Sequence, residues 1–219
     1  MKYQALKYTA HTGIVGIDTN PDGFALTVVD NKGNYKEHIY LKQHELTYAR
    51  TDRRKNLCGE LVKKVVEIAK EKGLGIALED LKFKQDKDVS SKFARIKYQF
   101  IYSQLLAMLE AACIREGIEV HKVKPQYTSK IGLYKYCHQY GMDIHNGAAM
   151  VIARRSYGFK EKVPKILKEL LIKEKTIFNK YNEWKRWQII NENIKRKEVN
   201  KPDFWIVNRK EILGLNLPF

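Results

Sequence analysis

The alternation of apolar and polar residues at the start of the chain predicts β-strands joined by tight turns. Two short apolar runs rich in β-favouring residues, 14–17 and 25–29, flank the turn-forming residues 20–23. A second turn signal at 31–34 leads into an alternating segment at 35–41. The beginning of the chain is therefore expected to form three antiparallel strands.

The pattern then alternates between helical and strand periodicity. Apolar residues recur at helical spacing within residues 46–72 and again within residues 101–117. Short apolar or alternating runs at 75–78 and 119–124 predict two further strands. Each predicted helix is thus followed by one predicted strand.

A last helix is predicted in this part of the chain at residues 146–156. Its small residues Gly147, Ala148 and Ala149 would let the first turn lie close to a sheet. The complete order of three strands, helix, strand, helix, strand, helix is that of the ribonuclease H fold. We therefore expect an α/β protein with a mixed five-stranded sheet and flanking helices.

Two acidic residues stand where a buried strand would normally carry an aliphatic residue. Asp18 ends the first apolar run, and Glu79 ends the run at 75–78. An isolated carboxylate at such a position costs free energy unless something neutralises it. A divalent metal ion would do so, which makes both residues candidate metal ligands.

The chain changes character after residue 158. Residues 160–198 carry apolar residues at helical spacing and predict one or two long amphipathic helices. The apolar face of these helices needs a partner, either the core of the same chain or a second protein chain, including a second copy. We therefore expect two parts, an α/β domain at 1–158 and a helical C-terminal extension at 159–219.

The net charge narrows the class of partner. The 219 residues include 41 Lys and Arg against 25 Asp and Glu, a formal charge of +16. Such an excess suits a nucleic acid, although a basic surface that serves only solubility is the alternative. Candidate contacts to phosphate are basic residues that follow the second acid or lie in the last predicted helix: Lys82, Lys84, Arg95, Arg154 and Arg155.

Cysteine usage and hydropathy bear on the compartment. The three cysteines are widely spaced and form neither a disulfide framework nor a CxxC pair, which suits a reducing cytoplasm. Neither a signal peptide nor a run long enough to cross a membrane is found. We therefore expect no membrane association.

Four sequence motifs occur in succession: GIDTN at 16–20, ALEDL at 77–81, VKPQYTSKIG at 123–132 and HNGAAMVIARR at 145–155. Together they resemble the RuvC-like nuclease core of the OrfB, or TnpB, proteins of bacterial insertion sequences, which are similar to type V CRISPR effectors. The resemblance covers roughly residues 12–158. It implies a metal-dependent DNA endonuclease of the prokaryotic cytoplasm, with Mg²⁺ or Mn²⁺ as cofactor and a guide RNA as a further partner.

The resemblance also implies the site residues. Asp18 matches the first acid of the family and Glu79 the second, but the third aspartate falls on His145, with Asp143 two residues earlier. Three interpretations remain open. His145 serves as a ligand or proton carrier, or Asp143 reaches into the site, or both residues only cap the last helix and the site is damaged.

This sequence departs from the family in two further ways. The zinc ribbon usual in the family is missing, since only Cys137 and His138 follow the third motif, and we expect no zinc. Only residues 1–13 precede the predicted strand of the first acid, where the family has regions that hold guide RNA and target. The chain is thus expected to be a fragment, or a nuclease that acts alone or with a partner.

Two alternative functions follow from these departures. One is a nucleic-acid-binding protein whose RuvC-like site has decayed, as the missing third aspartate suggests. The other is a Holliday-junction resolvase, which would require a dimer with two sites facing one junction.

Overall fold

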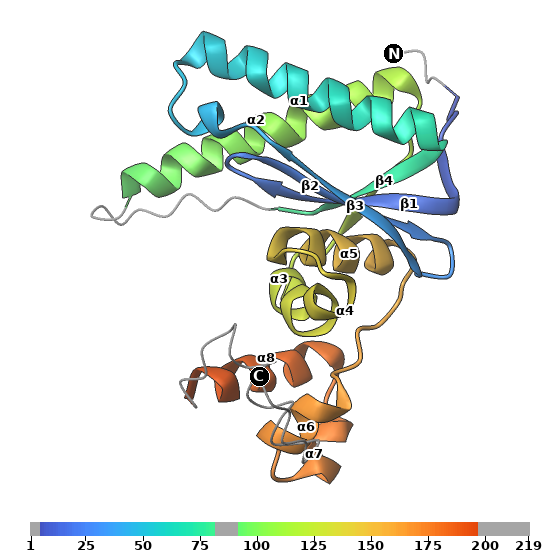
Figure 1. The fold of residues 1–219 in the computed structure, drawn as a ribbon, viewed down its shortest axis with the longest axis vertical. Helices are drawn as coiled ribbons and strands as arrows, with labels where there is room; N and C mark the ends of the chain where they lie inside the picture. Colours follow the sequence, from blue (N-terminus) through green and yellow to red (C-terminus); the bar gives the residue numbers. More distant parts are fainter. Residues whose placement is uncertain (1–4, 82–91, 197–219) are drawn as a thin grey trace, which may run out of the picture.

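The computed structural model describes residues 5–81 and 92–196, and it places a five-stranded sheet at the centre (Figure 1). Three strands open the chain, in line with the prediction: β1 (Thr9–Asn20), β2 (Gly23–Asp30) and β3 (Tyr35–Lys42). They are followed by the short 3₁₀ helix η1 (His44–Thr47) and by α1 (Thr51–Lys72), and then by β4 (Leu74–Glu79), α2 (Lys92–Glu116) and β5 (Val120–Val123).

The spatial order of the strands is β3-β2-β1-β4-β5. Strands β1, β2 and β3 pair in antiparallel fashion, whereas β4 lies parallel to β1 and β5 parallel to β4. This mixed order, with helices between the parallel strands, confirms the expected ribonuclease H-like topology. The first helix was expected from residue 46, but a separate 3₁₀ turn occupies 44–47 and α1 begins at Thr51.

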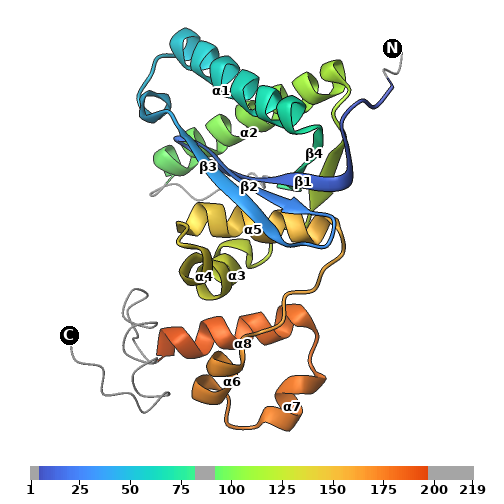
Figure 2. The same cartoon turned by 45° about the vertical axis from the view of Figure 1, so that its right-hand side comes forward.

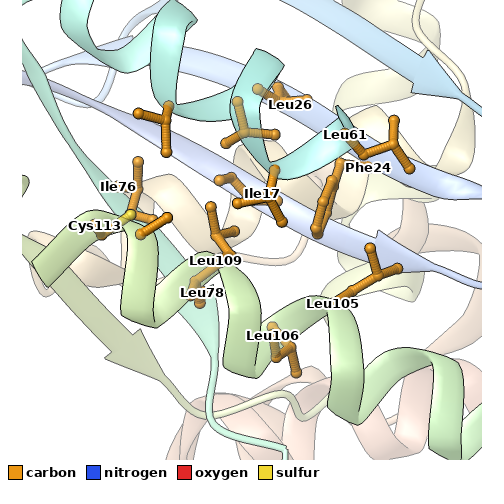
Figure 3. Close-up of a cluster of buried hydrophobic side chains, with 14 of the residues drawn as sticks. Ile17, Phe24, Leu26, Leu61, Ile76, Leu78, Leu105, Leu106, Leu109 and Cys113 are labelled. Carbon is orange, nitrogen blue, oxygen red and sulfur yellow. The ribbon is translucent and has the colours of Figure 1, made fainter. Parts of the chain in front are cut away.

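Helices cover both faces of the sheet (Figures 1 and 2). One face packs against α1 and α2 through apolar side chains such as Ile17, Leu26, Leu61, Leu78 and Leu109 (Figure 3). The opposite face packs against α5 (Ile144–Ser156), with α3 (Thr128–Gly132), the π-helical turn η2 (Leu133–Cys137) and α4 (His138–Tyr140) beyond it.

Close backbone contacts fix α5 against its neighbours. A Cβ added to Gly16 of β1 would collide with the carbonyl oxygen of Ala149 and would lie 2.7 Å from the Cβ of Ala153. The missing side chain of Gly16 therefore lets α5 approach the sheet, and the predicted role of Ala149 stays a prediction. Gly147 has another role, because a Cβ there would meet Gly132 of α3 and the sulfur of Cys137 instead of the sheet.

The C-terminal extension differs from the prediction. It forms three helices in place of one or two long ones: α6 (Lys165–Leu171), α7 (Lys175–Lys180) and α8 (Glu183–Arg196). Extended backbone at Ile172 and Tyr181 ends the first two, and the Asn182 side chain accepts a hydrogen bond from the Lys185 amide at the start of α8.

The apolar face of α8 is covered by the same chain. Trp187 and Ile190 are fully buried in a core cluster that also contains Val123 of β5 and Met150 of α5. The Trp187 indole donates a hydrogen bond of 2.8 Å to the Glu161 carbonyl. Of the two expected arrangements, the described residues show the one in which the extension folds back on the core. None of the described helices is both long and apolar enough to cross a membrane.

Candidate active site

Asp18 and Glu79 lie side by side at the carboxyl ends of two parallel strands. Ile17 of β1 is opposite Leu78 of β4, so the next residues along each strand are the two acids. Ile17 and Leu78 point into the core under α1 and α2. Because successive side chains alternate between the faces of a sheet, both carboxylates face the α5 side.

The Asp18 carboxylate is almost fully buried, with 7% of the residue exposed. Its Oδ2 atom is 3.1 Å from Nδ1 of His145 and accepts a 3.1 Å hydrogen bond from the side-chain amide of Asn20. Burial raises the pKa of Asp18 above its ordinary value and outweighs the stabilising contacts from His145 and Asn20, while the charge of Asp143 raises it further.

Glu79 is perturbed in the same direction. Burial is the main cause that raises its pKa to about 7, and the charge of Asp18 adds to it. The Thr128 hydroxyl of α3 donates a 2.6 Å hydrogen bond to Oε1, and the positive charge of Arg155 acts nearby, both of which lower the pKa. Two neighbouring carboxylates held away from water are an arrangement that a hard divalent cation would stabilise.

Near the position of the third acid, the structure has a feature of two of the three interpretations: the His145 ring contacts Asp18, and Asp143 caps α5. The Asp143 side chain is the N-cap of α5, where Oδ1 accepts hydrogen bonds of 2.8 Å from the amides of His145 and Asn146. His145 instead turns its ring toward Asp18, which raises the pKa of the imidazole. Its side chain is 40% exposed. His145 therefore lies against Asp18 and Asp143 caps α5, whereas a catalytic role of either residue stays a prediction.

A complete ligand set is not assembled in the described part of the chain, where no three His, Cys, Asp or Glu side chains converge closely enough to hold a metal ion. The two carboxylates fit a divalent cation by their chemistry and burial, whereas no third protein ligand is identified among the described residues. Cys137 donates through its sulfur to the carbonyl of Asp143 at 3.1 Å, so it supports the cap. The expectation of no zinc stays a prediction.

Asn146 anchors the start of α5, a role that the sequence did not suggest. The residue is 1% exposed, and its amide nitrogen donates hydrogen bonds to the carbonyls of Leu26 (2.8 Å) and Ile39 (3.0 Å). Its own carbonyl accepts a 2.8 Å bond from the Thr27 hydroxyl. These contacts tie the beginning of α5 to β2 and β3 and so place His145 over the end of β1.

The basic residues predicted to bind phosphate have different surroundings. Arg154 donates to Glu161 (2.7 Å) and to the Gly33 carbonyl, so its guanidinium is held in an internal ion pair, and its phosphate contact stays a prediction. Arg155 holds the carbonyls of Lys124 and Gln126, both at 2.7 Å, at the edge of the site. Lys82 and Lys84 lie outside the described residues, and Arg95 is placed only as part of α2.

Neither protein-family models nor curated protein sequences match this chain. Among solved structures, it is similar to Thermus thermophilus RuvC in complex with a Holliday junction substrate, with 16% identity, a TM-score of 0.48, and coverage of 68% of this chain and 95% of that chain. A second structure of Thermus thermophilus RuvC matches with 15% identity, a TM-score of 0.46, and coverage of 67% and 95%. Both TM-scores are below 0.5, so the strand order carries the conclusion: the chain has a ribonuclease H-like α/β fold.

Proposed function

We propose that this chain is a RuvC-like, metal-dependent DNA endonuclease of the OrfB type. The observation that carries the proposal is the pair of buried carboxylates, Asp18 and Glu79, side by side at the ends of β1 and β4 with His145 against the first. A buried pair of neighbouring carboxylates costs free energy, so a sheet with only a structural role would not be expected to contain one. The charge of +16 supports a polyanionic substrate.

Each residue has a distinct role in this proposal. Asp18 and Glu79 would hold Mg²⁺ or Mn²⁺, cations that activate the attacking water and stabilise the leaving oxygen in phosphodiester hydrolysis. The Thr128 hydroxyl fixes Oε1 of Glu79, and the Asn20 amide fixes Oδ2 of Asp18. His145 holds Asp18 through Nδ1, and its partly exposed ring can be reached by a DNA strand.

The experiment is cleavage of labelled single-stranded, duplex and branched DNA with Mg²⁺, Mn²⁺ or EDTA. We expect metal-dependent cutting by the wild type and its loss in Asp18→Asn and in Glu79→Gln. Asp52→Asn, an exposed acid in the first turn of α1, is the matched control and should cut normally. Cutting that persists in both site variants would contradict the proposal.

Two more variants separate the roles near the third acid. His145→Ala should abolish or strongly slow cleavage with little loss of stability. Asp143→Ala should mainly destabilise α5, because it removes the cap. Cleavage confined to branched DNA, together with a dimer at working concentration, would move the assignment to a junction resolvase.

A decayed, nucleic-acid-binding protein is the second candidate. It is favoured by the capping role of Asp143 and by the missing three-residue ligand set in the described residues. Unchanged DNA or RNA binding by both carboxylate variants, with no cutting in any metal, would support it. The proposal includes a guide RNA and a protein partner, as the resemblance implies. RNA that stays bound to the protein through purification in low salt would support the guide RNA.

A further inference from the structure

A pocket of about 270 Å³ lies where β5, the end of α5 and the start of α8 meet. It is lined by polar and aromatic side chains that include Lys124, Arg155, Lys160, Glu183 and Trp184. Its volume is near the lower end of the range of about 300–1,000 Å³ that is usual for ligand pockets. The pocket therefore suits a group of the size of one nucleotide.

Two polar atoms in the lining are buried and lack a hydrogen-bond partner among the described residues: Nε of Arg155, a donor, and Oε1 of Glu183, an acceptor. The terminal nitrogens of Arg155 are occupied by the Lys124 and Gln126 carbonyls, which fixes the orientation of the guanidinium. Buried polar groups are normally paired, and an unpaired one costs about 1–3 kcal/mol. A ligand with one acceptor and one donor on the same edge would satisfy both atoms.

The rest of the lining adds positive charge and an aromatic surface. Lys124 and Lys160 are exposed, and neither has an ion-pair partner in the described part of the chain. The Trp184 ring is half-buried, with the Arg155 guanidinium 4.5 Å from its centre. Lysines that contact phosphate and aromatic rings that contact bases are the combination by which proteins hold single-stranded nucleic acid.

We propose that this pocket binds one unpaired nucleotide of a DNA or RNA strand. The base edge would pair with Nε of Arg155 and Oε1 of Glu183, and the adjoining phosphates would lie between Lys124 and Lys160. Because a carboxylate accepts from an exocyclic amino group, the pocket would prefer cytosine or adenine to thymine. The choice of a nucleic acid as the ligand rests on the proposed function.

The pocket is next to the candidate active site. Val123 in its wall pairs with Glu79 across β4 and β5, and the Asp80 amide donates a 2.7 Å hydrogen bond to the Val123 carbonyl. The loop held by Arg155 leads directly to Thr128, which donates to Glu79. A nucleotide anchored in the pocket would therefore fix which neighbouring phosphodiester reaches the carboxylates.

The test measures binding of labelled homopolymers of about ten nucleotides in EDTA, a length within the usual footprint of single-strand binding folds. Oligo-dC, oligo-dA, oligo-dT and their RNA counterparts are titrated by fluorescence anisotropy at several salt concentrations. The variants are Lys124→Gln, Lys160→Gln and Glu183→Leu, because a glutamine at position 183 would keep an oxygen that accepts a hydrogen bond. Matched controls are Lys162→Gln and Glu174→Leu, at two exposed residues outside the pocket lining.

The expected result has two parts. Each lysine variant lowers the slope of log Kd against log salt by about 0.7, the value for one phosphate contact on a single strand. Wild type favours oligo-dC over oligo-dT by about fivefold or more, and Glu183→Leu, which has no acceptor, removes that preference. The two controls leave the salt slope and the base preference unchanged, and thermal melting confirms that every variant is folded.

The proposal is overturned if the base preference is absent from the wild type or survives in Glu183→Leu, even when the lysine variants change the salt slope. Equal behaviour of pocket variants and controls overturns it too. The DNA and RNA arms identify the strand. Because binding is measured without metal, a chain that cuts DNA but lacks the preference refutes only the pocket. A chain that shows the preference but never cuts refutes only the nuclease.

Discussion

The two faces of the sheet differ in the kinds of side chain that they bury. The face under α1 and α2 is closed by an apolar cluster whose members include Phe24, Leu105 and Leu109 (Figure 3). The face under α5 also has an apolar cluster, with Ile14 and Val29 from the sheet, but it adds buried polar groups, namely Asp18, Thr27 and Asn146. Burial on the first face lowers the free energy of the fold, whereas each polar group on the second must find a partner to avoid a cost.

This difference separates stability from chemistry within one sheet. Most of the polar groups on the α5 face are satisfied by hydrogen bonds to backbone, as with Asn146, or to other side chains, as with Glu79 and Thr128. The two carboxylates remain perturbed even so, because their pKa values are raised. The α5 face therefore combines an apolar core with the candidate site, whereas the face under α1 and α2 is packed by apolar side chains.

The sharpest test of this division neutralises the carboxylates. Asp18→Asn or Glu79→Gln should reduce cleavage by about 10³-fold, since loss of cation binding removes several kcal/mol of transition-state stabilisation. The melting temperature in EDTA should stay the same or rise, because a neutral amide is easier to bury than a carboxylate. Cleavage assays and thermal melting check both, and an equal loss of stability and activity would show a structural role.

A cavity in the apolar face should have the opposite effect. Leu109 is fully buried in α2, and Leu109→Ala should lower the free energy of unfolding by about 2–5 kcal/mol. Ile114 on the same helix is exposed, so Ile114→Ala should change it by less than about 0.5 kcal/mol. Urea titration measures both. If Leu109→Ala removed cleavage while the protein remained folded, the two faces would be coupled.

Asn146 is expected to affect both stability and cleavage. Asn146→Ala leaves the Leu26 and Ile39 carbonyls without their donor and should cost about 1–3 kcal/mol of unfolding free energy. Cleavage should fall as well, because the adjoining His145 loses its position. Asn31→Ala removes an exposed side-chain bond to the His11 carbonyl and is the control, with little effect on either measurement. Destabilisation without any loss of cleavage would limit Asn146 to a structural role.

The smallest expected effect concerns acid stability. Glu161 is fully buried, which raises its pKa, but the charges of Lys135 and Arg154 and the Tyr136 hydroxyl outweigh burial and hold the pKa below its ordinary value of 4.5. Its ionised form therefore stabilises the fold above that pH, and this contribution is lost as the pH falls through the folded value.

Glu161→Gln removes this titration. The wild type should be more stable than the variant at pH 7, and the difference should shrink progressively below about pH 4.5, as measured by urea titration at a series of pH values. Glu174→Gln, at an exposed residue, is the control and should follow the wild type. A difference that stays constant with pH would show that the glutamate does not act through its charge.

Local patterns predicted the elements and the two acids, because apolar periodicity and an acid at a strand end are visible within a few residues. The partners of those acids could not be predicted. Thr128 is 49 residues from Glu79, and Asn146 is 120 residues from Leu26. Such contacts depend on how the chain folds in three dimensions. The division of the extension into three helices was missed because apolar spacing continues across the breaks near Ile172 and Tyr181.

Gly16 has no functional group, yet the distance between the catalytic candidates depends on it. Its missing side chain lets β1 and α5 touch backbone to backbone, so the positions of Asp18 and His145 follow from main-chain contact. A library of single substitutions scored only by cleavage would mark Gly16 as intolerant, like Asp18 itself. Such a screen would show that the spacing between the strand and the helix is a requirement of its own, separate from the chemistry of the carboxylates.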